Sequence, residues 1–201
     1  MTETEKKNRI LEFSFKKFTT MGIAHVTMDE ISRGVGIGKG TLYKYFSSKE
    51  ALLFGTIEFV AARIEKKINE IMENEQLSPV DQLSLILKTV GEYLAKINPS
   101  VFANLERTQP EAYKKIIELR THIILTNMIK IFEEGKKSGL LEPDTDCFMI
   151  AQILIGAANH ITDEKLLSTL DYSLDSLFRT ITTTILKGCL TETGRKQAFK
   201  K

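Results

Sequence analysis

Basic and hydroxyl side chains gather in the short segment Lys39–Tyr45, and their spacing indicates a surface that binds nucleic acid. Leu42 and Phe46 are four residues apart, so a helix here would hold them on one face. The side chains left for other faces are Lys39, Thr41, Tyr43, Lys44 and Tyr45. Ammonium and hydroxyl groups on an exposed helix are typical of contacts to phosphates and base edges in the DNA major groove.

The flanking sequence predicts the helices that would position this segment. Thr27 with Glu30, and Ser47 with Glu50, have the spacing of a capping box, in which hydroxyl and carboxylate satisfy open N–H groups at a helix start. The glycines between residues 34 and 38 predict a turn between two helices of about seven residues, too short to be stable alone. An apolar stripe near helical period predicts a supporting helix over residues 6–21.

Catalytic and metal-binding patterns are missing from the sequence. It has no Gly-x-Ser-x-Gly motif, no phosphate-binding glycine loop after a strand and no His/Glu zinc motif. The sequence has three histidines, His25, His122 and His160. None of them forms an i,i+4 pair with another His or Cys. We therefore expect no enzyme, no metal site and no cofactor.

The segment Lys39–Tyr45 and the helices predicted around it closely resemble the DNA-binding region of the tetracycline-repressor family of bacterial transcriptional regulators. The resemblance covers roughly residues 6–56. At fixed spacing it is carried by Thr27, Ile31, Ser32, Gly34, Val35, Gly36, Ile37, Gly38, Gly40, Leu42, Tyr43, Tyr45, Phe46, Lys49 and Leu52. Ser32 stands where the family usually has alanine, and small or aliphatic residues fill positions 34–38.

The resemblance implies an all-α protein with two domains. Residues 1–47 would form an N-terminal three-helix helix-turn-helix domain, and residues 48–201 a six-helix ligand-binding and dimerisation domain. Four prolines and the lack of strand alternation also favour helices. Beyond the first domain, Ser78 and Asp144 are expected as helix caps, and the basic C-terminal tail is expected to fray. Helices are expected near residues 47–74, 80–97, 99–107, 110–135, 148–161 and 167–186.

For DNA contacts, the resemblance and the side-chain chemistry select one set: Thr27, Lys39, Gly40, Thr41, Tyr43, Lys44, Tyr45 and Lys49. Lys39 would lie at a helix N-terminus, where open N–H groups favour phosphate, and Lys44 could donate to guanine. Purely structural roles stay open for three members: Thr27 as a cap, Tyr45 as a partly packed ring and Lys49 as a solvated charge.

Charge and cysteine content narrow the class of protein further. The formal net charge is only +2, but residues 1–50 carry nine Lys or Arg and six Asp or Glu, an excess of +3 where DNA is expected. Cys147 and Cys189 lack metal-ligand spacing, so reduced thiols are expected. A polar N-terminus and the lack of an apolar run of about 20 residues predict a soluble, cytoplasmic protein with no membrane partner.

Two further sites follow from the resemblance. A ligand cavity between the middle helices would be lined by Phe59, Arg63, Phe102, Leu105, Glu106, Tyr113, Met128, Gln152, Asn159 and His160. Apolar members of this set could equally be plain core, and His160 a hydrogen-bonded core histidine. Dimerisation through the last two helices would use Ala151, Leu154, Ile155, Ala158, Leu174, Leu177, Phe178 and Ile181, unless these residues pack within one chain.

The function predicted from these observations is a homodimeric, ligand-responsive transcriptional repressor. It would bind double-stranded operator DNA with an inverted repeat and be released by a small, mostly apolar effector. The alternative is a DNA-binding regulator of the same fold that responds to a protein partner or to redox state. A helical interaction module with no DNA role is disfavoured, because Lys39, Tyr43 and Lys49 would then have no task.

Overall fold

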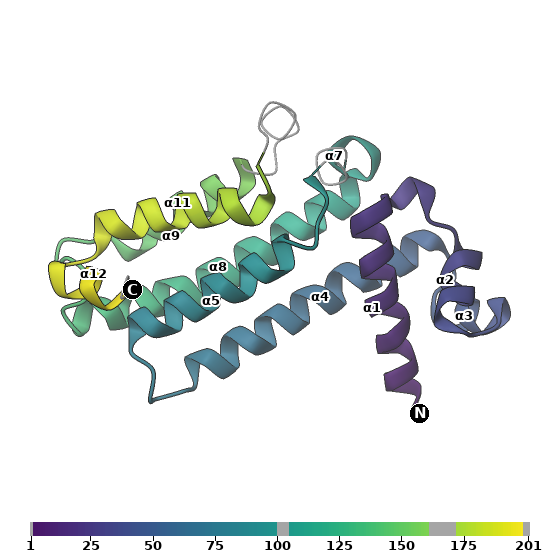
Figure 1. Ribbon diagram of the computed structural model, residues 1–201, viewed down its shortest axis with the longest axis horizontal. Helices are drawn as coiled ribbons and strands as arrows, with labels where there is room; N and C mark the ends of the chain where they lie inside the picture. The colour runs from purple at the N-terminus through teal and green to yellow at the C-terminus, as the bar shows by residue number, and fades with distance from the viewer. Residues whose placement is uncertain (1, 100–104, 161–171, 199–201) are drawn as a thin grey trace.

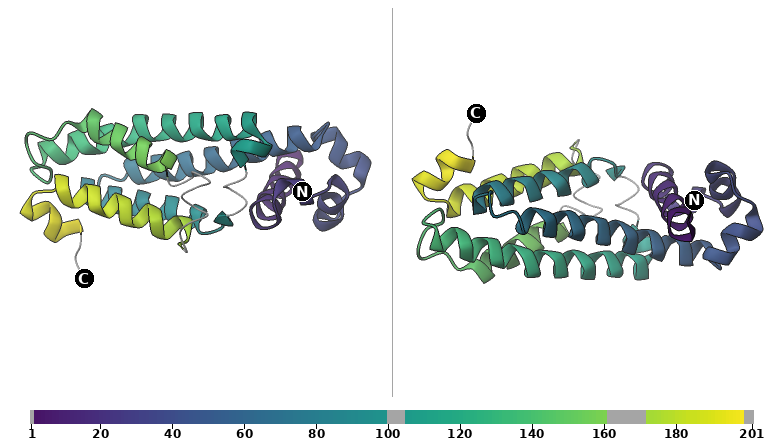
Figure 2. Two further views of the ribbon diagram at one scale, coloured as in Figure 1. Left: turned by 90° about the horizontal axis from the view of Figure 1, so that it is seen from above. Right: turned by 90° about the horizontal axis from the view of Figure 1, so that it is seen from below.

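The computed structural model describes residues 2–99, 105–160 and 172–198. Over these ranges the all-α prediction is confirmed, and the β contact that occurs there is an isolated bridge between Leu141 and Leu190. The molecule is elongated, with its N-terminal helices grouped at one end (Figures 1 and 2). These are α1 (Glu3–Met21), the 3-10 turn η1 (Ile23–His25), α2 (Met28–Val35) and α3 (Lys39–Tyr45).

A hydrophobic core fixes these short helices to one another. Ile10 of α1, Ile31 of α2 and Leu42 of α3 are each at most 1% exposed and belong to one cluster of buried side chains. Gly34 allows α2 to lie close to α1, because a Cβ at this position would be 2.1 Å from Cζ of Phe13. Packing against α1 therefore supplies the stability that helices of this length lack.

The turn between α2 and α3 depends on a glycine. Gly36 ends α2 with φ 73° and ψ 39°, the left-handed conformation in which a side chain is strained. The N–H of Ile37 then donates to the carbonyl of Ser32 at 3.0 Å. This turn sets the direction in which α3 leaves the core.

The long helix α4 (Lys49–Met72) connects the two ends of the molecule. Its first half contributes Leu52 to the N-terminal core, and its second half contributes Ile68 to the larger core, both 0% exposed. The prediction that Ser47 caps this helix is wrong by one residue. Ser48 is the extended N-cap residue, and its hydroxyl accepts the N–H of Ala51 at 3.0 Å.

The remaining helices pack lengthwise around the larger core. The predicted Ser78 cap is confirmed, since its hydroxyl accepts the N–H of Asp81 at 3.2 Å. Helix α8 contacts α4, α5 and α9, while α11 contacts α5 and α9, as Figure 1 shows. The bounds are α5 (Pro79–Leu94), α7 (Leu105–Thr108), α8 (Pro110–Lys137), α9 (Cys147–His160), α11 (Leu174–Cys189) and α12 (Glu192–Ala198).

Two predictions about the C-terminal part are wrong. Asp146, not Asp144, lies at the start of α9 and accepts the N–H of Met149 at 3.0 Å. The basic tail is not frayed up to residue 198, because α12 docks on the loop after α8. There the N–H of Thr191 donates to the carbonyl of Leu140 at 3.1 Å, and a Cβ at Gly194 would lie 2.1 Å from the same oxygen.

The length and the hydropathy of the helices bear on whether any of them could span a membrane. In the part of the chain that the structure describes, none combines the length and the apolar character that crossing a bilayer requires.

Candidate nucleic-acid interface and internal cavity

Helix α3 presents a polar face to solvent, as its sequence predicts. Leu42 is fully buried, whereas the Tyr43 side chain is 42% exposed. Thr41 and Lys44 are also exposed, and a Cβ at Gly40 would meet nothing within 4 Å. The face thus combines an ammonium group, two hydroxyls and an uncovered stretch of backbone, which are the groups that bind phosphates and base edges.

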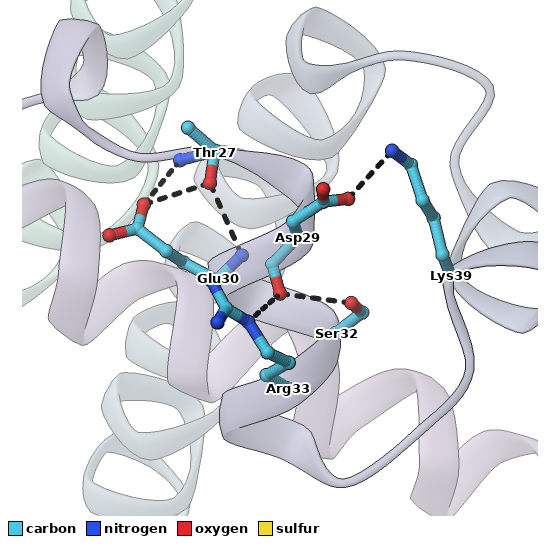
Figure 3. Close-up of polar contacts among 6 residues, drawn as sticks. All are labelled: Thr27, Asp29, Glu30, Ser32, Arg33 and Lys39. Carbon is cyan, nitrogen blue, oxygen red and sulfur yellow. Dashed lines mark hydrogen bonds and ion pairs between the residues drawn. The ribbon is translucent and has the colours of Figure 1, made fainter.

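Lys39 reaches back from α3 to α2. Its Nζ lies 2.8 Å from Oδ1 of Asp29, and both side chains remain more than half exposed (Figure 3). The hydrogen bond to Asp29, and then the charge of that carboxylate, raise the pKa of Lys39. Lys39 is therefore cationic at neutral pH and is held at the edge of the exposed α3 face.

Thr27 and Glu30 form the predicted capping box at the start of α2 (Figure 3). The backbone N–H of Thr27 donates to Oε2 of Glu30 at 2.8 Å, and the N–H of Glu30 donates to Oγ1 of Thr27 at 3.2 Å. The bond from the Thr27 backbone, followed by that from its hydroxyl, lowers the pKa of Glu30. The cap role of Thr27 is confirmed, and its predicted DNA contact stays a prediction.

Tyr45 and Lys49 make contacts within the chain. The Tyr45 hydroxyl donates to the Glu3 carboxylate, which raises the pKa of Tyr45 and lowers that of Glu3. Nζ of Lys49 donates to the carbonyls of Ile23 and Val26 at 3.0 and 3.1 Å. Lys49 thereby ties the start of α4 to the segment that leads into α2.

An internal cavity of about 280 Å³ lies between six helices. Its lining is almost entirely apolar and comes from α1, α4, α5, α8, α9 and α11, together with Ile23, Ile97 and Leu105. Phe15 and Phe18 of α1 belong to the lining, so the cavity borders the N-terminal helices directly. Of the predicted ligand residues, Leu105 and Met128 line it.

The other predicted ligand residues within the described ranges do not line the cavity. Phe59 packs against the N-terminal core, and Arg63 lies over its ring at 5.3 Å while pairing with Glu12 at 3.1 Å. Tyr113 packs on the small cluster around Leu105. The remaining members are the exposed Glu106 and His160, the half-buried Gln152, and Asn159, whose amide oxygen accepts from Arg120. Phe102 lies outside the described residues.

Most lining residues were not predicted from the sequence, and the one with distinctive chemistry is Arg120 on α8. It is the one charged side chain among the described lining residues. Its Nη1 donates to the carbonyl of Ala158 at 2.9 Å, and its Nη2 donates to the amide oxygen of Asn159. A usable signal was present, because Arg120 interrupts the apolar stripe of residues 116–128 that faces the core.

The residues predicted for the dimer seam face the interior of their own chain. Ala151 is 0% exposed and Leu174 1%, and Ile155 and Leu177 are also buried or half-buried. Cavity-lining members of the set are Leu154, Ala158, Phe178 and Ile181. The opposite face of α9 is apolar and open to solvent, with Phe148 53%, Met149 51% and Ile153 51% exposed.

Comparisons with known proteins agree with this geometry. A family model described as "Bacterial regulatory proteins, tetR family" matches residues 10–55. The uncharacterised HTH-type transcriptional regulator YhgD of Bacillus subtilis is 27% identical over 141 residues, which are 69% of this chain and 73% of that protein.

Solved structures share the fold over nearly the full length. The fatty acid degradation regulator FadR from Bacillus halodurans superposes with a TM-score of 0.68 at 21% identity, covering 94% of this chain and 98% of that one. FadR from Bacillus subtilis, solved in complex with stearoyl-CoA, gives 0.60 at 18% identity over 90% and 97%. Likeness at this level of identity speaks for the arrangement of the helices alone.

Proposed function

We propose that this chain, which belongs to the tetR family of bacterial regulatory proteins, is a repressor that a small, mostly apolar effector releases from operator DNA. Family membership makes it a DNA-binding transcriptional regulator. Repression and response to an effector are the proposal, and one observation carries them. The helices that hold α3 in place are also walls of the internal cavity.

Two helices make this connection. Phe18 of α1 is 4% exposed, belongs to the N-terminal core and also lines the cavity. Helix α4 places Leu52 in the N-terminal core and, farther along, Val60 and Ile64 on the cavity wall. A ligand that displaces the cavity wall must therefore move the supports of α3.

The effector acts through its different affinity for two arrangements of these helices. A ligand shifts a conformational equilibrium only by that difference, which is typically about 1–3 kcal/mol. Lys49 would carry a movement of α4 to the segment before α2 through its bonds to Ile23 and Val26. Because coupling is reciprocal, operator DNA should weaken effector binding by the same factor.

DNA recognition by this chain would use a two-fold dimer. One helix of seven residues offers few base contacts, and dimers read two half-sites about 34–36 Å apart, or at a multiple of that spacing. We place the seam on the exposed apolar face of α9 around Phe148, Met149 and Ile153, since such contiguous patches mark interaction surfaces. The polar face of α3 would supply the contacts, with Tyr43, Lys44 and Thr41 at base edges or phosphates.

An apolar effector is supported by the lining of the cavity and by a structural neighbour. Described lining residues are aliphatic or aromatic apart from Arg120, a few threonines and the Tyr93 phenol. The FadR neighbour from Bacillus subtilis was solved with stearoyl-CoA, a molecule with a long apolar chain. Both observations favour a ligand that is mostly hydrocarbon.

Binding to DNA from the region flanking the gene tests the proposal. Fluorescence anisotropy with duplexes that contain its inverted repeats should give an affinity that falls steeply with salt. The variant Tyr43→Ala should bind weakly, and an apolar effector should release the wild-type protein. Binding that is equal for all sequences, or release by no compound, would contradict the proposal.

The alternative, regulation by redox state, receives no support from the cysteines. Burial, followed by a hydrogen bond with Glu133, raises the pKa of Cys147 to about 11, and burial also raises the pKa of Cys189. Thiols in this condition are poorly reactive, because the thiolate is the nucleophile. Regulation by a protein partner remains the second candidate, and insensitivity of operator binding to every apolar compound would favour it.

A further inference from the structure

We infer that the cavity takes an amphiphile with one acidic group, whose carboxylate pairs with Arg120 while its hydrocarbon chain lies along the apolar walls. The inference rests on the proposed function, because it names the chemical class of the effector. It is carried by the position, the burial and the incomplete hydrogen bonding of a single arginine.

Arg120 is held in one orientation by α9. Its Nη1 donates to the carbonyl of Ala158 at 2.9 Å, and its Nη2 donates to the side chain of Asn159. Within residues 2–99, 105–160 and 172–198 the Nε–H has no acceptor, although this nitrogen is buried. A guanidinium group offers five N–H donors, so this one retains donors for another acceptor.

The charge of Arg120 has no acidic partner in the described part of the chain. Among the residues that the structure describes, no Asp or Glu forms an ion pair with it. Burial lowers the pKa of Arg120 to about 10, and Tyr113 acts in the opposite direction, so the group still stays cationic at neutral pH. A buried charge without a counter-ion is costly, and a carboxylate on the ligand would remove that cost.

The rest of the cavity suits a hydrocarbon chain. Its walls include Phe15 and Phe18 of α1, Ile57 of α4, and Val90, Ile124 and Ile181 of α5, α8 and α11. A volume of about 280 Å³ is just below the range for small-molecule pockets, about 300–1,000 Å³, which favours a medium-length chain.

Other head groups fit this site less well. A neutral alcohol would leave the guanidinium without a counter-ion, and an amine would place a second positive charge beside it. A carboxylate can accept the free Nε–H together with a second N–H of the same planar group, the paired geometry in which arginine binds acids best.

Three ligands that differ only in the head group test the inference. Binding of decanoate, decan-1-ol and decylamine to the full-length protein is measured by calorimetry at neutral pH, below their micelle concentrations. Decanoate should bind about tenfold more tightly than decanol or better, as a charge-assisted hydrogen bond predicts, and decylamine should bind most weakly. Equal affinities for decanoate and decanol would overturn the inference.

Variants of Arg120 test whether this residue causes the preference for decanoate. Arg120→Met should lose the preference for decanoate over decanol, while Arg120→Lys should keep part of it. Lys115→Met is the matched control, because Lys115 lies on the same helix, pairs with Glu58 at 3.6 Å and does not line the cavity. Circular dichroism checks folding, and if Arg120→Met does not fold, the head-group series on the wild-type protein still decides.

The outcomes separate this inference from the proposed function. A decanol-sensitive operator complex without any preference for decanoate would refute the acidic head group and leave a ligand-responsive repressor. Tight decanoate binding that depends on Arg120 but leaves operator affinity unchanged would support the acidic site and contradict its regulatory role.

Discussion

Lys39 in the first turn of α3 and Asp29 in the first turn of α2 form an ion pair, with 2.8 Å between Nζ and Oδ1. The lysine that the sequence assigns to DNA is thus neutralised by its own protein when DNA is absent. In the proposed DNA contact, phosphate would compete with Asp29 for the ammonium group, and the carboxylate would repel the approaching DNA backbone. The pair would then set the strength of DNA binding as well as the position of Lys39.

Asp29→Asn should strengthen operator binding. Removal of the carboxylate frees Lys39 and removes repulsion, and because exposed pairs are weak the gain should be modest, up to about fivefold per half-site. Fluorescence anisotropy across a salt series measures the change. Glu73→Gln, at the far end of α4, controls for net charge, and equal gains in the two variants would refute a local effect.

Tyr43→Ala should weaken operator binding without affecting the fold. The ring is 42% exposed, and a good base contact is worth about 1–3 kcal/mol. The neighbouring Leu42→Ala should instead lower the stability of the fold, since a fully buried leucine contributes about 2–5 kcal/mol to it. Thermal unfolding and anisotropy on both variants check this, and a lowered melting temperature for Tyr43→Ala would count against the proposed contact.

Acid should remove the contribution of the α2 cap. Hydrogen bonds from Thr27 lower the folded-state pKa of Glu30 below its ordinary 4.5, so the ionised carboxylate stabilises the fold above that pH. This contribution disappears as the pH falls through the lowered pKa. Urea unfolding of wild type and Glu30→Gln should show a difference in stability at pH 7 that shrinks by pH 3. A difference that grows toward acid would reverse the assignment.

Gly194→Ala should destabilise the C-terminal end. The new methyl group would lie 2.1 Å from the Leu140 carbonyl oxygen, and overpacking typically costs about 1–3 kcal/mol. Gly188→Ala is the control, because its Cβ would meet nothing within 4 Å and alanine favours the helix. Differential scanning calorimetry should show a lower melting temperature for the first variant alone.

Ile153→Glu should separate the proposed dimer into folded monomers. The side chain is 51% exposed in the single chain, so the charge harms the seam and not the fold. Leu85→Glu on α5, at a position 38% exposed, is the matched control and should remain dimeric. A dimer that persists in light scattering with Ile153→Glu would place the seam elsewhere.

The helices α2 and α3 were predictable because their signals are local. The spacing of Thr27 and Glu30, the turn at Gly36 and the four-residue interval from Leu42 to Phe46 depend on a few neighbouring residues. Only the cap of α4 was misplaced, and adjacent serines such as Ser47 and Ser48 offer the same chemistry one position apart.

The cavity was not predictable to the same degree because it depends on contacts between distant helices. Arg63 lies on α4 as expected, but Glu12 of α1 draws it away from the interior. Arg120 became a lining residue only because Ala158 and Asn159 of α9 hold it there. The helical tail likewise depends on the Leu140 carbonyl, 54 residues before Gly194 in the sequence.

Helix α1 packs Ile10 against α2 and α3 and also contributes Phe15 and Phe18 to the cavity lining. During evolution, changes at Phe18 that admit a new molecule would also alter the packing of α2 and α3, because Phe18 belongs to the N-terminal core as well. Under the proposed function, ligand preference and operator affinity would therefore change together at this position. Val90 and Ile181 line the cavity from α5 and α11 and do not belong to the N-terminal core. Substitutions that change ligand preference should therefore concentrate at these two positions.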